Sequence, residues 1–326
     1  AAAADRHTLL AQLAKEHPAV TANLCETLFS RDGGVIQMSH RPSMREWAPK
    51  NRMQTVMVAD YWSDVQVAAR QLLGLAGEDA LRWLALLGHL KKLTPDVYEL
   101  VLTGINEAIE AFPASQRLKL RDGLRKLLHH HNQFVDRDKE IGWLYTEATL
   151  ERLTHLYEAL VPVDSVEAHA WLFAFWPERP FDTGTDWKLE QEALEQDRLN
   201  AAEILSQVGL EHLLERLGEF ESRRALGISL ARTKLGNDLA VDLFQGHGES
   251  AQPAVQELIQ GFASHLSQSG YDVFVNKWID ASSQDQLPEL ACATLLLGLP
   301  SAPPTWDTAA KRGPSCEGAY WKQANI

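Results

Sequence analysis

Three consecutive histidines are the side chains of this sequence that most readily suggest metal chemistry. Residues 129–131 are all histidine, and Asp136 and Asp138 follow them closely. Imidazole and carboxylate groups together can bind a transition metal, so a metal site that uses His130, Asp136 and Asp138 is one hypothesis. Consecutive helical residues point about 100° apart, however, and therefore cannot all face one ion. The interpretation that we favour is a solvated helix end whose histidines interact with the helix dipole, with no metal or other cofactor.

The segment 31–58 is basic within an acidic protein. Guanidinium groups beside an indole can hold an anionic ligand, a nucleic-acid strand or an acidic partner surface by charge and stacking. The alternative is that these cations neutralise acidic side chains of neighbouring helices, and the sequence leaves both interpretations open. The candidate binding residues of this segment are Arg41, Arg45, Trp47, Lys50 and Arg52.

A second candidate contact segment leads from Phe175 to Trp187. Two prolines make it unsuitable for a helix, and Trp176 and Arg179 are its candidate binding residues. Exposed aromatic side chains on such a loop would indicate a docking surface. The interpretation that we favour is that they fold back and close the groove between neighbouring helix pairs.

No sequence motif of a known catalytic or phosphate-binding site is present. The chain contains neither of the glycine-rich patterns G-x-x-x-x-G-K and G-x-G-x-x-G, and neither G-x-S-x-G nor H-E-x-x-H. Three widely spaced cysteines form neither a four-cysteine zinc site nor a disulfide framework. We therefore predict a non-catalytic segment, and the alternative is an all-helical metal- or phosphate-dependent enzyme with a site assembled from distant helices.

Composition favours a folded protein of the cytoplasm. Hydrophobic residues make up 45% of the chain and charged residues 23%, which is typical of globular proteins. The net charge of −13 repels a nucleic-acid backbone overall, so nucleic-acid binding is disfavoured except locally at the basic segment. No apolar run is long enough to predict a membrane span, and the few cysteines fit a reducing compartment.

Helices are the elements expected to position these residues. Apolar residues recur at helical spacing, as at Val255, Leu258 and Phe262, and Thr146 and Asp186 are suitable helix caps. We therefore predict an all-α fold, an irregular α-solenoid of antiparallel helix pairs. The predicted helices are 5–16, 18–30, 59–74, 77–92, 94–112, 115–131, 146–160, 164–175, 186–208, 210–219, 221–234, 236–245, 251–268, 271–280, 286–298, 303–312 and 315–325.

The domain organisation expected from this pattern has three parts. Residues 1–30 end a preceding helical unit, 31–58 form the long basic loop, and 59–326 form a helical-repeat array with a soft boundary near 176–185. The chain begins at Ala1 without an initiator methionine and ends directly after a helical stretch, so we expect it to be part of a longer polypeptide.

Tryptophan and tyrosine recur in one internal pattern. The spacing W-x13-Y-W joins Trp47 to Tyr61-Trp62 and also Trp306 to Tyr320-Trp321. Ten tryptophans are present, so either a duplicated unit or coincidence accounts for the pattern.

Several short sequence motifs support a resemblance to a class of helical-repeat proteins. They are S-H-R-P at 39–42, W-L-A-L-L-G at 83–88, A-W-L-F at 170–173, and the closing W-x13-Y-W. With its paired helices, the chain resembles the HEAT-like and TPR-like regions of very large bacterial proteins, such as those attached to anti-phage defence effectors. The resemblance implies a scaffold or sensor segment that binds a protein or another part of its own polypeptide, with catalysis housed elsewhere. We expect contacts at 31–58 and 176–185.

Overall fold

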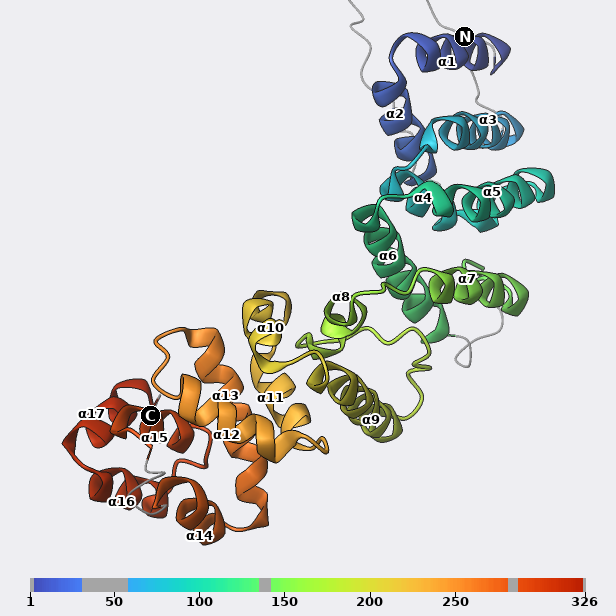
Figure 1. Ribbon diagram of the computed structural model, residues 1–326. Coiled ribbons are helices and arrows are strands. Elements are labelled where there is room, and N and C mark those ends of the chain that lie inside the picture. The colour runs from blue at the N-terminus through green and yellow to red at the C-terminus, as the bar shows by residue number, and fades with distance from the viewer. Residues whose placement is uncertain (1–2, 31–57, 135–141, 281–286, 325–326) are drawn as a thin grey trace, which may run out of the picture. The chain divides into compact units, whose positions relative to one another are not determined.

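The computed structural model describes residues 3–30, 58–134, 142–280 and 287–324, and these residues are predominantly helical (Figure 1). No β-strand occurs within these ranges, which confirms the all-α prediction. The chain consists of two compact units, Ala1–Val161 and Pro162–Ile326, and each has its own hydrophobic core. The segment 176–185, predicted as a soft boundary, lies inside the second unit, and residues 3–30 pack within the first.

Unit 1 is built from seven described α-helices in two rows. The helices α1, α3, α5 and α7 lie in one row, and α2, α4 and α6 lie beside them (Figure 1). The main contacts join each helix to the next one or the next but one. The bounds are α1 Ala3–Glu16, α2 Pro18–Ser30, α3 Val58–Ala76, α4 Ala80–Leu87, α5 Pro95–Ala108, α6 Ala114–Asn132 and α7 Glu147–Ala159, with short 3-10 helices at Leu90–Lys92 and Ile109–Ala111.

Ion pairs link successive members of the row α1, α3, α5 and α7. The charged groups are partly or largely exposed, and pairs of this kind stabilise a fold only slightly. They do tie each helix to its neighbour at a defined position. The pairs are Arg6 with Asp64 at 2.7 Å, Arg70 with Asp96, and Arg152 with Glu99 at 2.9 Å.

Unit 2 repeats the same contact pattern, and most of its helices are shorter. The series α9, α11, α13, α15 and α17 is connected through direct contacts between successive members. The bounds are α8 Ser165–His169, α9 Trp187–Ser206, α10 Leu210–Glu215, α11 Arg223–Ala231, α12 Gly236–His247, α13 Pro253–Leu266, α14 Tyr271–Phe274, α15 Glu289–Leu296, α16 Pro303–Arg312 and α17 Pro314–Gln323. The 3-10 helices are Ala170–Phe173, Leu217–Glu219 and Ser267–Ser269, and a π-helix spans Val275–Ile279.

The crossing of α11 and α13 in unit 2 depends on two glycines. Gly227 of α11 and Gly261 of α13 have their Cα atoms near each other, since a Cβ built on Gly227 would lie 3.1 Å from the Gly261 Cα. The same Cβ would lie 2.3 Å from the carbonyl oxygen of Leu258. Only glycine permits backbones to approach this closely.

Two predicted helix caps are confirmed, and several predicted helices are divided, among them the one over 77–92. The Thr146 side chain accepts from the Thr149 N–H, and Asp186 accepts from the first N–H groups of α9. The helix predicted over 77–92 instead runs from Ala80 to Leu87. Its continuation is interrupted because the Tyr145 hydroxyl donates to the Leu87 carbonyl and accepts from the Leu90 N–H.

No helix in the described part of the chain is long and apolar enough to cross a membrane.

Candidate functional site

Four aromatic side chains are exposed on the segment that enters α9. We call residues 175–187 the aromatic segment; its exposed rings are Phe175, Trp176, Phe181 and Trp187. Trp176 is 83% exposed and Trp187 is 67% exposed. The prediction that these rings fold back between helix pairs is therefore wrong.

The physical reason for this exposure is that the chain leaves the core just before the segment begins. Phe173 is fully buried and packs edge-on against Phe220 at 5.7 Å between ring centroids. The Phe173 carbonyl accepts from the Ser222 N–H at 2.8 Å. Residue Ala174 is extended, so the chain turns away and the next ring, Phe175, faces solvent.

Arg198 of α9 fixes the backbone at the start of the aromatic segment. Its Nε donates to the Leu172 carbonyl at 2.9 Å and its Nη2 to the Ala174 carbonyl at 3.3 Å. Glu195 holds the guanidinium group through an ion pair of 3.1 Å. The side chain is only 14% exposed, so water competes weakly for these bonds.

Arg179 fixes the middle of the aromatic segment in a similar way. Its guanidinium group pairs with Asp182 and also with Asp197 of α9, at 2.8 Å to the latter. Farther along, the Gly184 N–H donates to Glu190 at 2.5 Å. Arg179, predicted as a binding residue, is thus engaged in the bonds that hold the segment, whereas Trp176 is presented to solvent.

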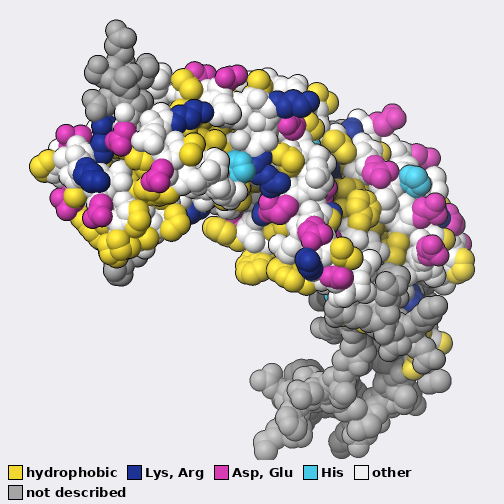
Figure 2. Space-filling model, turned by 90° about the horizontal axis from the view of Figure 1, so that it is seen from below, with side chains coloured by type: hydrophobic (Ala, Val, Ile, Leu, Met, Phe, Trp, Pro, Cys, Tyr) yellow, Lys and Arg dark blue, Asp and Glu magenta, His cyan; other side chains and the backbone are white. Residues whose placement is uncertain are grey.

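The charge around the aromatic segment is strongly negative. Residues 175–198 contain seven acidic and three basic side chains. Each basic side chain has a carboxylate partner, and the third of these pairs joins Lys188 to Glu192 at 3.9 Å. On the face drawn in Figure 2, apolar side chains reach the surface in patches, and both acidic and basic side chains lie among them.

The three histidines lie in the last turn of α6 and have different environments. His131 is buried and stacks on Tyr145 at 4.0 Å between ring centroids, and its Nδ1 accepts from the Tyr145 N–H at 3.3 Å. Burial, with the nearby charges of His130 and Lys91, lowers the pKa of His131 to about 4. The predicted solvated helix end is therefore wrong for His131. His130 is exposed and stacks on Trp143 at 4.8 Å.

Two of the three candidate metal ligands lie outside the described residues. Asp136 and Asp138 belong to the part of the chain that the structure does not describe. Within the described ranges, no group of three or more His, Cys, Asp or Glu side chains is placed to hold a metal ion. The basic-segment candidates Arg41, Arg45, Trp47, Lys50 and Arg52 also lie outside the described residues.

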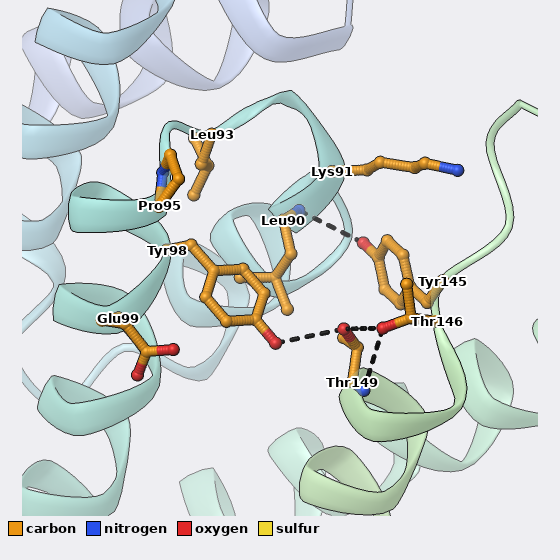
Figure 3. A pocket seen from close by; sticks show the side chains of 9 residues that line it. All are labelled: Leu90, Lys91, Leu93, Pro95, Tyr98, Glu99, Tyr145, Thr146 and Thr149. Carbon is orange, nitrogen blue, oxygen red and sulfur yellow. Dashed lines mark hydrogen bonds between the residues drawn. The ribbon is translucent and has the colours of Figure 1, made fainter.

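Unit 1 has a cavity of about 400 Å³ between the starts of α5 and α7 (Figure 3). Its apolar wall includes Leu90, Leu93 and Pro95. Tyr98 of α5 reaches toward α7: its hydroxyl lies 3.0 Å from the Thr149 hydroxyl, which in turn lies 2.9 Å from that of Thr146 (Figure 3).

The groups around this cavity do not form an activated nucleophile. Glu99 lines the cavity, but the hydrogen bond from Arg152 lowers the pKa of this carboxylate, which makes it a weaker base. The three hydroxyl groups bond to one another in a row rather than to a histidine or carboxylate. The cavity can accept an apolar group with a hydrogen-bonding atom, and its geometry supplies no acid–base pair.

The two copies of the W-x13-Y-W pattern lie in different settings. Trp306 and Trp321 contact each other at 5.8 Å between ring centroids, and Tyr320 is buried. In the other copy Tyr61 and Trp62 lie in the first turn and a half of α3, and Trp47 falls outside the described residues.

Comparison with known proteins places the chain in no family. It matches no family model, no curated protein and no solved structure.

Proposed function

We propose that this chain is a non-catalytic helical scaffold segment, an irregular α-solenoid of antiparallel helix pairs within a larger bacterial polypeptide. Serial contacts between alternate helices in each unit support this arrangement, because repeat arrays bury their apolar faces mainly between near neighbours. A scaffold of this kind binds a protein partner or another domain of its own polypeptide. The resemblance of its short sequence motifs to those of helical-repeat regions favours a sensor or scaffold role beside a defence effector.

The observation that carries the proposal is a set of exposed aromatic rings on a fixed backbone. Tryptophan and other aromatic side chains supply much of the binding energy at protein interfaces. Ordering a loop on binding costs free energy, and this cost is reduced when the loop is already held in place. Arg179 and Arg198 hold the aromatic segment, while Trp176 and Trp187 remain exposed. The segment is therefore suited to docking a partner.

Site-specific crosslinking tests this function. A photoreactive phenylalanine derivative would replace Trp176 in the full-length protein in its native host, and a matched control would carry it at Val163, which is fully exposed in the same unit. A protein crosslinked from position 176 is then purified and its affinity for the chain measured by titration calorimetry. We expect Trp176→Ala to weaken this affinity by about tenfold or more.

The proposal fails under either of two results of this experiment. One is an identical set of crosslinked proteins from both positions. The other is an affinity for the purified partner that stays within twofold when Trp176 is replaced by alanine.

The basic segment 31–58 is the second contact that we propose, and nucleic acid is its alternative ligand. Alanine substitution of Arg41, Arg45 and Trp47 should weaken partner binding by more than a few tenths of a kcal/mol if the segment takes part. Nucleic-acid binding predicts an affinity that falls steeply with salt. A flat response between low and physiological salt concentration would remove that alternative.

A further inference from the structure

We infer that the partner of the aromatic segment is a protein segment rich in arginine, whose guanidinium groups stack on Trp176 and Trp187 and pair with carboxylates of α9. This inference rests on the proposed function and adds the chemistry of the partner. Three observations carry it: the sign of the local charge, the engagement of the local cations, and the type of the exposed rings.

The local charge selects a cationic partner. Residues 175–198 contain seven acidic side chains and only three basic ones. The three basic groups already pair with carboxylates, and the most exposed of them, Lys188, lies at the long distance of 3.9 Å from Glu192. An incoming guanidinium group would find Glu192 63% exposed and only weakly engaged. Nucleic acid and anionic lipid would instead be repelled.

The exposed rings select arginine among the possible cationic groups. Guanidinium groups stack on aromatic faces, and tryptophan offers the most favourable ring for a cation. The chain uses this interaction internally: the Arg152 guanidinium lies 5.5 Å from the Tyr98 ring centroid, and the Arg121 guanidinium lies 4.9 Å from that of Tyr157. The two exposed indoles and the carboxylates of residues 175–198 are the same two kinds of groups that bind arginine in unit 1, the Tyr98 ring and Glu99.

Two labelled peptides test this inference directly. One is a short fluorescein-labelled peptide that alternates arginine with leucine, and the other is its glutamate–leucine counterpart. Fluorescence anisotropy with the full chain should show binding of the arginine peptide alone, with an affinity that falls as salt screens the charges. The double variant W176A/W187A should lose about tenfold or more in affinity, and Glu192→Gln should lose a smaller factor.

Matched variants keep the result interpretable. Trp62→Ala removes an indole that is 43% exposed in unit 1, and it should leave the affinity unchanged. Circular dichroism checks that W176A/W187A remains folded, as expected for rings that are largely exposed. Equal binding of the two peptides, or an unchanged affinity of W176A/W187A, would overturn the inference. So would tighter binding of the chain to a nucleic acid or an anionic vesicle than to the arginine peptide.

The outcome is distinguishable from failure of the proposed function. If crosslinking from position 176 identifies a partner that contacts the segment through acidic or purely apolar residues, the scaffold function stands and the arginine inference is lost. If position 176 captures nothing beyond what position 163 captures, the docking function itself is lost.

Discussion

Replacing Gly227 by alanine probes the close crossing of α11 and α13 in unit 2. The new Cβ atom would lie 2.3 Å from the Leu258 carbonyl oxygen, 3.1 Å from the Gly261 Cα and 3.1 Å from the Phe262 nitrogen. All three are backbone atoms, which cannot rotate away as a flexible side chain can. Helices α11 and α13 would therefore have to move apart by about 1 Å, since normal van der Waals contact needs about 3.5 Å.

The expected change in stability is the difference between two effects. Forcing an extra carbon into a well-packed core costs about 1–3 kcal/mol, and the upper end applies because the opposing atoms are backbone. Alanine favours the helical state over glycine by about 1 kcal/mol, which acts in the opposite direction. We therefore expect Gly227→Ala to lower the free energy of unfolding by about 2 kcal/mol. For a unit of this size, that corresponds to a midpoint about 4–8 °C lower.

Thermal unfolding followed by circular dichroism measures the effect, and hydrogen exchange of α11 and α13 localises it. The matched control is Gly318→Ala in α17, where no atom lies within 4 Å of the added Cβ. The control should unfold at the same temperature as the wild type or slightly above it. A midpoint for Gly227→Ala equal to or above the wild-type value would refute the close-approach argument.

A double variant separates this explanation from a general loss of packing. A Cβ on Gly261 would lie 2.3 Å from the Arg224 carbonyl oxygen, at the same crossing. Once one substitution has separated α11 from α13, the second should cost less than it does alone. A strictly additive effect of Gly227→Ala and Gly261→Ala would contradict a shared crossing.

Three further predictions concern side chains that form contacts within one unit: His131 and Tyr145 in unit 1, and Arg198 in unit 2. The pKa of His131 falls from 6.5 to about 4 on folding. Its contribution to the free energy of unfolding is therefore fully present above pH 6.5 and is lost as the pH falls toward 4. Over that range we expect wild-type stability to fall by about 2–3 kcal/mol more than that of His131→Gln, measured by urea unfolding; parallel pH profiles would contradict this. Tyr145→Phe removes the hydrogen bonds to the Leu87 carbonyl and from the Leu90 N–H, and should lower the free energy of unfolding in urea by about 1–3 kcal/mol. A loss below about 0.5 kcal/mol would contradict this role of the hydroxyl. Arg198→Ala should speed amide exchange in residues 174–181 by about tenfold, whereas rates within twofold of wild type would show that other bonds hold the segment.

Helix positions could be predicted because they depend on local patterns. The apolar stripe with Val255, Leu258 and Phe262 lies on α13, and these three residues are buried there. Capping residues marked helix starts correctly at Thr146 and Asp186. The division after Leu87 could not be predicted, because it depends on a hydroxyl group from Tyr145, far along the chain.

The environments of the candidate site residues were less predictable. The two prolines correctly predict a segment outside a helix, and the sequence identifies Trp176 as a candidate contact residue. Arg198 lies 22 residues farther along and binds the backbone just before Trp176, and no sequence signal links it to the carbonyl groups of Leu172 and Ala174. The burial of His131 similarly depends on a stacking partner, Tyr145, on the other side of residues that the structure does not describe.

The same bonds explain both the wrong prediction for the aromatic segment and its proposed role. An aromatic side chain usually becomes buried because its backbone can follow it into the core. Here Arg198 and Arg179 bind the backbone and acidic neighbours of the segment, so the rings of Trp176 and Phe181 stay outside. Leaving these rings in water costs hydrophobic free energy that a partner can recover by covering them. If the arginines hold the segment for binding, weakening Arg198 should reduce partner affinity even though Trp176 is unchanged, because the loop would then have to be ordered at each binding event.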